Sequence, residues 1–525
     1  MPYFDFHVHP TLKCMFSEAG SKTSPWIDID VRKIPWILRW CSEFEYILST
    51  QADLRMLHKN KVNLICVAVF VPERGMTDNS LILKQAEGTL QCYLNPARLK
   101  KINDETLKPY PDLVDEDLDV LFNNTRFNIA DKQIVALTKD VEYDENDVSK
   151  TYVVFSVEGL HSLSPTLEKT KIDKTTILNN LDELRAAIPI ISINITHLEQ
   201  YPFINQAYGI QFVSNEDFRP TGNRFSQDGI DILRHCYEHN IIVDIKHQSL
   251  ATRRMLIEDL RKKDDFKNIL QPLVCTHAGF AGISYADIPD YITIAPVAGK
   301  TYSRINWGKP KKYGMLDFML AFNPSSINLY DEDILAVIYS GGMIGLNLDK
   351  RILGYAEANT NDASYEIITE EEEYISNAEK DVYLTKPVIG SKMNNSYCIS
   401  TQEVVDGGMV NPKLGFYHLC HFMQHVLHFI KLAQQTPDVN KALTQICIGS
   451  DFDGIINPVW CCPSMNFLDK FKKQFIDNFK AFAKANKREV QLPKKFDVKQ
   501  FAEQLFFENG KNFVLNRLKI IHSKS

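Results

Sequence analysis

Eight short apolar runs recur along this 525-residue chain, and they limit the folds that it can adopt. Each run is rich in Val and Ile and nearly continuous in apolar residues, which is typical of strands buried on both faces. The runs are Tyr3–His9, Val62–Val71, Tyr152–Glu158, Ile190–Thr196, Ile241–His247, Leu273–His277, Met343–Leu348 and Ile446–Asp451. Patterns with apolar residues at helical spacing lie between them: Thr176–Ala187, Asp228–His239, Ala251–Lys263, Asp331–Ser340 and Phe416–Gln434. This alternation predicts an α/β fold with parallel strands, and eight repeats can close into a (β/α)8 TIM-like barrel; a doubly wound open sheet is the alternative.

Four connections are much longer than a turn between a strand and a helix. They cover about residues 10–60, 72–150, 280–328 and 350–415, and each directly follows a predicted strand. In a barrel this position lies at the mouth of the active site, where lids and specificity loops are built. We therefore expect one barrel domain over residues 1–525, with functional insertions at the C-terminal face of the strands.

The composition disfavours several classes of partner. With 44% hydrophobic residues, 24% charged residues and a formal net charge of −7, the chain has no basic bias toward nucleic acid or anionic membrane. The N-terminus enters a strand without the basic and apolar stretches of a secretory signal, and no apolar run approaches the roughly 20 residues of a membrane span. The eleven cysteines are scattered and form no CxxC motif, which favours reduced thiols. We expect a cytoplasmic protein with a small-molecule substrate.

Two histidines end the first predicted strand. In a strand, residues i and i+2 point to the same face, so His7 and His9 can both point into a barrel and bind one metal ion. An HxH tripeptide alone is a weak signal, but here it lies where a barrel places its functional groups. Asp5 has the same parity and lies deeper, so we interpret it as a supporting or structural acid.

Glu158 closes a strand that is otherwise uncharged, Val-Val-Phe-Ser-Val-Glu. Burying an unpaired carboxylate costs several kcal/mol, and a metal ion would supply the missing partner. An acid bonded to backbone or water at the strand end is the alternative. His161, three residues further on, is expected in a loop beside the site.

His247 and His277 end two successive predicted strands. Adjacent strands lie about 4.8 Å apart, so two imidazoles at these ends can share a metal ion at about 2.0–2.1 Å each. Either histidine alone would more often be a hydrogen-bonded core residue. Asp244 has the opposite parity to His247, so a regular strand would turn it away from the site, and we interpret it as structural.

Asp451 and Asp453 follow the eighth predicted strand in Gly-Ser-Asp-Phe-Asp-Gly. A carboxylate at this point can ligate a metal ion and also take a proton from the attacking water. Asp and Gly also favour turns, which is the alternative for this segment. We expect Asp451 to be the ligand and general base, and Asp453 to be its companion in the turn.

Six short motifs in order make the pattern more specific. They are His-x-His, Val-Glu-Gly-x-His-Ser-Leu, Asn-Ile-Thr-His, Val-Asp-Ile-Lys-His, Cys-Thr-His-Ala and Gly-Ser-Asp-Phe-Asp-Gly. Together they resemble the membrane dipeptidase (renal dipeptidase, peptidase M19) family of the amidohydrolase superfamily. The C-terminal segment Phe507–Phe513 is similar to the closing helix of that family. The resemblance spans nearly all the predicted strands.

The resemblance implies a barrel that holds a pair of divalent metal ions, most simply Zn²⁺. Glu158 would bridge them, and the remaining ligands would be His7, His9 and Asp451 on one ion and His247 and His277 on the other. His197, after the fourth strand, matches the family's histidine that contacts the substrate and polarises its carbonyl or the developing oxyanion. The alternative for His197 is a loop histidine bonded to Glu199 or to a backbone carbonyl.

The chain departs from that family in ways that bear on the substrate. The animal dipeptidases begin with His-x-Asp, and an imidazole in place of that carboxylate removes one negative charge from the first metal. The family's arginine after the sixth-strand histidine, which receives the substrate carboxylate, has no match here, because Ala278–Ala281 leads into an insertion. The candidates to replace it are Arg304, Lys300, Lys309, Lys311 and Lys312.

The predicted activity is hydrolysis of a dipeptide or a related small N-acyl amino acid by a metal-bridged hydroxide. Asp451 would transfer the proton to the leaving amine, while zinc and His197 stabilise the oxyanion. A lactone, lactam or other small amide is the alternative substrate, since a barrel and a metal pair do not determine the leaving group. A catalytically silent barrel used as a binding protein is a further alternative, and the acidic balance disfavours a nuclease. The resemblance also suggests a homodimer.

One further histidine cluster lies before the eighth strand. His418, His421, His425 and His428 are at helical spacing and could in principle bind a metal ion on one helix face. The helix that carries them is expected on the outside of the barrel, so we predict that they pack or face solvent instead.

Overall fold

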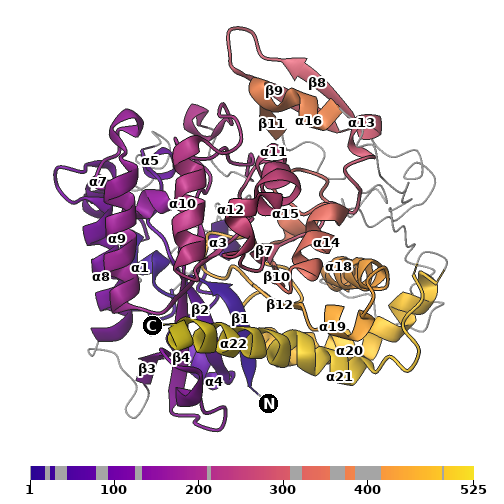
Figure 1. Cartoon of the computed structure of the whole chain (residues 1–525). Helices are drawn as coiled ribbons and strands as arrows, with labels where there is room; N and C mark the ends of the chain where they lie inside the picture. Colours follow the sequence, from indigo (N-terminus) through magenta and orange to yellow (C-terminus); the bar gives the residue numbers. More distant parts are fainter. Residues whose placement is uncertain are drawn as a thin grey trace.

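Parallel strands form the centre of the molecule, and helices surround them (Figure 1). The computed structural model describes residues 2–17, 24–29, 44–78, 93–123, 133–209, 215–307, 322–354, 373–384, 416–487 and 490–524. All eight predicted strands are present: β1 Tyr3–Val8, β2 Val62–Val69, β4 Lys150–Glu158, β5 Ile190–Asn194, β6 Ile242–Val243, β7 Val274–Ala278, β10 Met343–Leu346 and β12 Ile446–Ile448. The prediction of an α/β protein with a parallel sheet is therefore confirmed.

The strands form a curved parallel sheet in two ladders. One has the order β1-β2-β4-β5-β6, and the other has the order β7-β10-β12. Single parallel bridges join their edges, one between Asp244 and Val274 and one between Val8 and Phe452. A short additional strand, β3 (Gln133–Ala136), pairs with β4. Consecutive strands along the chain are thus neighbours in space, apart from the small strands of the insertions.

One buried cluster contains side chains from all eight strands. They are Phe4, Phe6, Leu64, Cys66, Tyr152, Val154, Ile191, Ile242, Val274, Met343 and Cys447. Phe507, Val514 and Leu518, from the C-terminal segment and α22 (Asn509–Lys524), belong to the same cluster. Glu158 is an even number of residues from Tyr152 and Val154. Regular alternation along β4 therefore points its carboxylate to the same side of the sheet, at the end of the strand.

The helices between the strands begin and end close to the predicted positions. The structure has α9 Lys174–Ala187, α10 Gln227–Glu238, α14 Asp331–Tyr339 and α18 Phe416–Ala433. Side chains cap two of them, since Asp173 accepts a hydrogen bond from the backbone of Thr176, and Ser226 accepts one from Gly229. The prediction of one regular helix over Ala251–Lys263 is wrong in detail. This segment is α11 Leu250–Arg254, a π turn Met255–Asp259 and a 3-10 turn Leu260–Lys262, which apolar spacing does not distinguish from a regular α-helix.

The described parts of the long connections contain their own secondary structure. Strands β8 Ile292–Pro296, β9 Tyr302–Trp307 and β11 Glu373–Ser376 form a small antiparallel sheet, seen at the top of Figure 1, which joins the last two insertions. The remaining helices in and around the connections are α1 Leu12–Phe16, α3 Phe44–Leu48, α4 Leu54–Lys59, α5 Arg74–Thr77, α7 Pro96–Asn103, α8 Tyr110–Asn123, α12 Asp264–Lys267, α13 Ile288–Tyr291, α15 Lys350–Leu353, α16 Lys380–Leu384, α19 Val439–Ala442, α20 Leu468–Ala485 and α21 Val498–Glu503.

The described residues bear on two expectations, the absence of a membrane span and the reduced state of the cysteines. In the described part of the chain, no helix has both the length and the apolar character needed to cross a bilayer. The cysteines in these ranges are buried and free of disulfides: Cys14, Cys66, Cys236, Cys275, Cys420, Cys447, Cys461 and Cys462. They are core thiols, as expected.

Candidate metal centre

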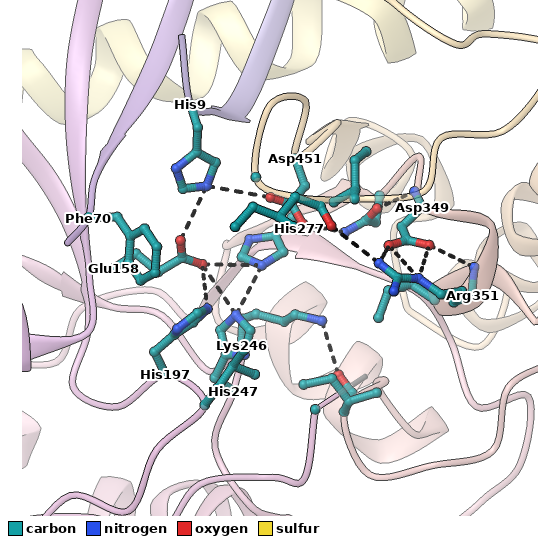
Figure 2. Close-up of a pocket in the computed structure, with 18 of the residues that line it drawn as sticks. His9, Phe70, Glu158, His197, Lys246, His247, His277, Asp349, Arg351 and Asp451 are labelled. Atoms are coloured by element: carbon teal, nitrogen blue, oxygen red, sulfur yellow. Dashed lines mark hydrogen bonds and ion pairs between the residues drawn. The ribbon is translucent and has the colours of Figure 1, made fainter. Parts of the chain in front are cut away.

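The carboxylate of Glu158 lies at the centre of a group of imidazoles and acids (Figure 2). Glu158 is the last residue of β4, and His277 lies within β7. His7 comes from β1, and its neighbour His9 directly follows that strand. Segments far apart in the sequence therefore meet at one end of the sheet.

The first part of this group includes the two histidines of the HxH motif. Their Nε2 atoms are 3.1 Å apart, and they lie 3.4 Å (His7) and 3.3 Å (His9) from the two carboxylate oxygens of Glu158. Asp451 Oδ1 lies 3.4 Å from His9 Nε2. Two nitrogens that share a tetrahedral metal at about 2.0–2.1 Å are separated by about 3.4 Å, so the donors have the spacing that a metal ion needs.

The second part of the group includes the other strand-end histidines. His247 Nε2 and His277 Nε2 are 3.1 Å apart, and they lie 3.2 Å and 3.4 Å from Glu158 Oε1. Glu158 is therefore shared by two histidine pairs, and all these side chains are buried. Buried His and Glu clusters of this kind can hold metal ions.

The imidazoles around Glu158 differ in how readily they are protonated. Burial lowers the pKa of His247 to about 3 and holds the pKa of His277 well below its usual value, so both are neutral. Burial by itself would raise the pKa of Glu158, but the surrounding imidazoles, His7 and His197 foremost, hold it well below its usual range. Burial also disfavours charge on His9, yet its hydrogen bonds to Asp451 and Glu158 raise its pKa to about 10. A proton on His9 therefore occupies a position that suits a metal cation.

The backbone at the site adopts unusual conformations. His247 has φ +67° and Asp451 has φ +62°, and they lie a few residues beyond the ends of β6 and β12. Non-glycine residues rarely adopt left-handed conformations, and such strained positions cluster at functional sites. Gly159, next to Glu158, has φ +80°, and a Cβ atom there would collide with the ring of His161.

A hydroxyl group between two of the histidines determines their tautomers. Thr276 Oγ1 donates a hydrogen bond of 2.6 Å to Asp244, so it must accept from Nδ1 of His7 at 3.0 Å and from Nδ1 of His277 at 3.2 Å. With Nδ1 engaged in this way, Nε2 is the nitrogen of each ring that is available to a metal ion beside Glu158. Asp244 has a structural role, as expected, but the expectation that it is turned away from the site is wrong, because it bonds to Thr276 beside His7 and His277. Regular pairing of β6 ends at Val243, so strict alternation does not apply at Asp244.

The other predicted acids have supporting positions. Asp5 accepts hydrogen bonds from the backbone of Ser450 and His7, and burial raises its pKa to about 7. Asp453 forms a buried ion pair with Lys13 at 2.6 Å and accepts a hydrogen bond from the backbone of Gln51. Asp453 thus connects the beginning and the end of the first insertion to the turn that carries Asp451, in agreement with its predicted place in that turn.

His197 lies beside the centre and has a partner that the sequence reasoning missed. Its Nδ1 lies 2.6 Å from Glu73 Oε1, and its Nε2 lies 3.7 Å from Glu158 Oε1. The expected alternatives, a bond to Glu199 or to a backbone carbonyl, are therefore wrong. Glu73 follows β2 at the start of the second insertion, and an acid just beyond a strand end was the available signal. His161 lies in the adjacent turn, where its Nε2 donates to the carbonyl of Val71 at 2.8 Å.

A cavity of about 90 Å³ opens beside the group. Its walls include apolar side chains such as Leu12, Phe70 and Ile352 together with two cations, Lys246 and Arg351. Lys246 is 1% exposed, and among the described residues its ammonium makes one hydrogen bond, to the carbonyl of Ile327 at 3.3 Å. Arg351 forms an ion pair with Asp349 at 2.6 Å.

These cations differ from the ones that we expected. Arg304 lies in β9 of the small antiparallel sheet, and Lys300 pairs with Glu216 at the surface; neither lines the cavity. Lys300 lies between β8 and β9, and Arg304 lies within β9, so both belong to this hairpin. Lys309, Lys311 and Lys312 lie outside the described residues. Lys246 was missed because it precedes a predicted ligand and regular alternation would turn it away.

The four histidines of α18 are packing residues. All are buried, at most 1% exposed, so the prediction of a packing role is confirmed and that of solvent exposure is not. His425 accepts a hydrogen bond from the backbone of Phe280 and donates to the carbonyl of Leu353, while His428 Nε2 lies 2.7 Å from Asp331. They connect α18 to the segments beside it.

Comparisons with known proteins give structural similarities at low sequence identity. No protein-family model matches the sequence, and no curated protein matches it. A metallopeptidase from Rhodobacter sphaeroides, liganded with a phosphinate mimic of the dipeptide L-Ala-D-Ala, aligns over 99% of both chains with 12% identity and a TM-score of 0.44. Dipeptidase AC, a metallopeptidase of family M19, aligns over 98% of both chains with 13% identity and a TM-score of 0.42. The probable dipeptidase PvdM from Pseudomonas aeruginosa aligns over 91% of this chain and 90% of its own, with 12% identity and a TM-score of 0.42. These values do not establish the family of this chain.

Proposed function

We propose that the chain is a metal-dependent hydrolase that cleaves the amide bond of dipeptides or related small N-acyl amino acids. One observation carries the proposal: the buried carboxylate of Glu158 is shared by the pairs His7 with His9 and His247 with His277. Burying a carboxylate costs free energy that a bound cation would offset. The ordered motifs that resemble the membrane dipeptidase family support the same class of reaction.

We also infer that the strands form one closed (β/α)8 barrel within a single domain of residues 1–525. Two observations support closure. The bridges Asp244–Val274 and Val8–Phe452 join the edges of the two ladders, and one buried cluster contains residues from all eight strands. The active centre would then lie at the C-terminal ends of the strands, where barrel enzymes carry it.

The donor set suits two divalent ions, most simply Zn²⁺, because it combines imidazole nitrogens with carboxylate oxygens. His7, His9 and Asp451 would hold one ion, His247 and His277 would hold the other, and Glu158 would bind both. Such ions supply a Lewis acid for the substrate carbonyl and lower the pKa of water that they bind.

The protein's own groups would handle the proton and the developing charge. Asp451 is an acid at the edge of the cavity, so it can take the proton of the attacking water and return it to the leaving amine. His197 is held by Glu73 at Nδ1 and lines the cavity. Burial opposes charge on His197, but the carboxylates of Glu73 and Glu158 raise its pKa, so its imidazolium form can donate a hydrogen bond from Nε2 to the oxyanion. The apolar walls exclude bulk water, which strengthens both interactions.

Lys246 and Arg351 give the cavity a preference for an anionic substrate. The ammonium of Lys246 has three donors and one hydrogen bond among the described residues, so it can accept a carboxylate group of the substrate. Arg351 already pairs with Asp349, so its contribution is smaller. A free carboxylate beside the scissile amide is the feature shared by dipeptides and N-acyl amino acids.

The test is a substrate panel on the zinc-reconstituted full chain, followed by mass spectrometry. The panel contains L,L- and L,D-dipeptides, N-acetyl amino acids and small lactones, with Glu158→Gln as the inactive control. Chelator-sensitive cleavage of dipeptides or N-acyl amino acids, lost in the control, is the expected result. Turnover of lactones alone would replace the proposed substrate class, and no turnover of any member by metal-loaded protein would overturn the proposal.

A further inference from the structure

A second group of metal-ligating side chains lies away from the cavity, between two neighbouring helices. Asp182 of α9 and the pair His235 and His239 of α10 place one ligand atom each within 4.8 Å of one another. We propose that these three residues bind a divalent transition-metal ion, such as Zn²⁺, and that this ion joins α9 to α10. The two histidines are four residues apart, so they lie on the same face of their helix. The site is independent of the proposed hydrolase activity.

Existing hydrogen bonds prepare the ligands. His239 Nδ1 lies 2.8 Å from the carbonyl of His235, so Nδ1 carries the proton and Nε2 is left with its lone pair. His235 Nε2 donates a hydrogen bond to Asp182 Oδ1 at 3.1 Å, and a metal ion would take the place of that proton. The two imidazole rings are 4.1 Å apart between centroids. Ligands on a tetrahedral ion are separated by about 3.4 Å, so rotations of half-buried side chains can bring the three atoms to bonding distance.

The charge distribution also suits a cation. His235 lies in the last turn of α10, and His239 is the residue that caps its C-terminus. The carboxyl end of a helix carries partial negative charge, which favours a bound cation there.

The position shows that the role is structural. α9 and α10 run in the same direction, since Lys174 pairs with Asp231 near their starts and Asp182 pairs with His235 near their ends. Each helix leads directly into its strand, so these ends lie where strands begin. Glu158 lies where a strand ends, so the outer site is at the opposite end of the sheet. A metal ion there would stabilise the pairing of the helices without contact with the substrate.

One neighbour competes with the ion. Arg185 Nε donates to Asp182 Oδ1 at 2.8 Å, and its positive charge opposes a cation at the same carboxylate. The proposal therefore predicts variants that weaken zinc binding and a variant that strengthens it. Removing a ligand should weaken binding, while Arg185→Gln should strengthen it because the carboxylate becomes free.

The experiment measures zinc bound per full-length chain by equilibrium dialysis and elemental analysis, together with the melting temperature at increasing Zn²⁺. The variants are His239→Gln, Asp182→Asn and Arg185→Gln. Asp231→Asn, an acid on the same helix outside the cluster, is the matched control. Circular dichroism of each variant establishes that the fold is retained.

We expect His239→Gln and Asp182→Asn each to lose one zinc equivalent and the zinc-dependent rise in melting temperature, with catalytic turnover unchanged. Arg185→Gln should shift half-saturation of this equivalent to lower zinc, and Asp231→Asn should match the wild type. Unchanged zinc content in both ligand variants would overturn the proposal. A loss of zinc of the same size in Asp231→Asn would also overturn the proposal, because the effect would then come from the removal of a negative charge in general and not from the loss of a ligand.

Discussion

Glu73 Oε1 lies 2.6 Å from His197 Nδ1, and both side chains are buried. Burial alone would raise the pKa of Glu73, but the neighbouring imidazoles of His197 and His161 lower it to about 2, so Glu73 is a permanent anion. The same carboxylate accepts a hydrogen bond from the backbone of Leu198. An acid from the second insertion thus determines which nitrogen of His197 faces the cavity.

This contact predicts that Glu73→Gln lowers kcat by about 10- to 100-fold while KM and bound zinc stay near wild type. The amide can present the wrong atom to Nδ1 and lacks the charge that orients the imidazole. Steady-state kinetics with zinc analysis checks the prediction. Glu199→Gln is the matched control, because Glu199 is an acid of the same region that bonds to the backbone of Gly75 and not to His197. Equal losses of kcat in both variants would contradict a positioning role for Glu73.

Thr276→Val should weaken zinc binding at the centre by about 10- to 100-fold, because the hydroxyl that keeps His7 and His277 in the metal-binding tautomer is lost. Competition with a zinc chelator of known affinity measures the effect. Thr151→Val is the control, since Thr151 is buried in β4 and its hydroxyl has no partner among the described residues. Wild-type zinc affinity in Thr276→Val would show that the relay from Asp244 has no influence on the ligands.

Lys246→Met should raise KM for substrates with a free carboxylate by about 10- to 100-fold, the cost of one lost charge-assisted hydrogen bond. Substrates amidated at that position should be affected little. The measurement is the ratio of kcat/KM for the acid and the amide of one substrate, in wild type and variant. Arg351→Gln serves as the comparison, with a smaller effect on that ratio because Arg351 pairs with Asp349. An unchanged ratio in Lys246→Met would exclude Lys246 as the carboxylate-binding residue.

Glu332 makes stability depend on pH. Burial raises its pKa from 4.5 to about 7, although Ser284 and Tyr285 donate hydrogen bonds to it. The unfolded chain therefore loses this proton at lower pH than the folded chain, and Glu332 lowers the free energy of unfolding as pH rises from about 4.5 to 7. In Glu332→Gln this decrease, up to about 3 kcal/mol, should be absent. Urea unfolding at pH 4.5, 6 and 7.5 tests it, and parallel profiles for both proteins would contradict it.

Much of the fold was predictable because strands buried on both faces leave a strong compositional pattern. Each of the eight apolar runs became a strand, and the ligand types at their ends came together around Glu158. Parallel strands bring their C-terminal ends to one edge, so residue types at strand ends are informative even without coordinates. His9 and Asp451, from opposite ends of the sequence, illustrate this directly.

The rest depended on features that a one-dimensional pattern does not contain. Regular strand alternation placed Asp244 and gave Lys246 no role, but β6 pairs regularly only over Ile242–Val243, and His247 then adopts a positive φ. Glu73 lies in an insertion, where no periodicity relates it to His197. The sequence indicated only a packing or solvated role for His235 and His239, because their third partner, Asp182, comes from another helix and becomes evident only in the packed structure.

The most direct test of the central claim is turnover of a dipeptide by metal-free protein as zinc is added, for wild type and Glu158→Gln. Both proteins carry His239→Gln in addition, so that the proposed site at Asp182, His235 and His239 does not contribute to the zinc bound per chain. We expect turnover to rise with zinc in the wild type, to disappear with chelator and to be absent in Glu158→Gln at every zinc concentration. Hydrolysis that is independent of zinc, or wild-type turnover in Glu158→Gln, would contradict a metal centre built on this carboxylate.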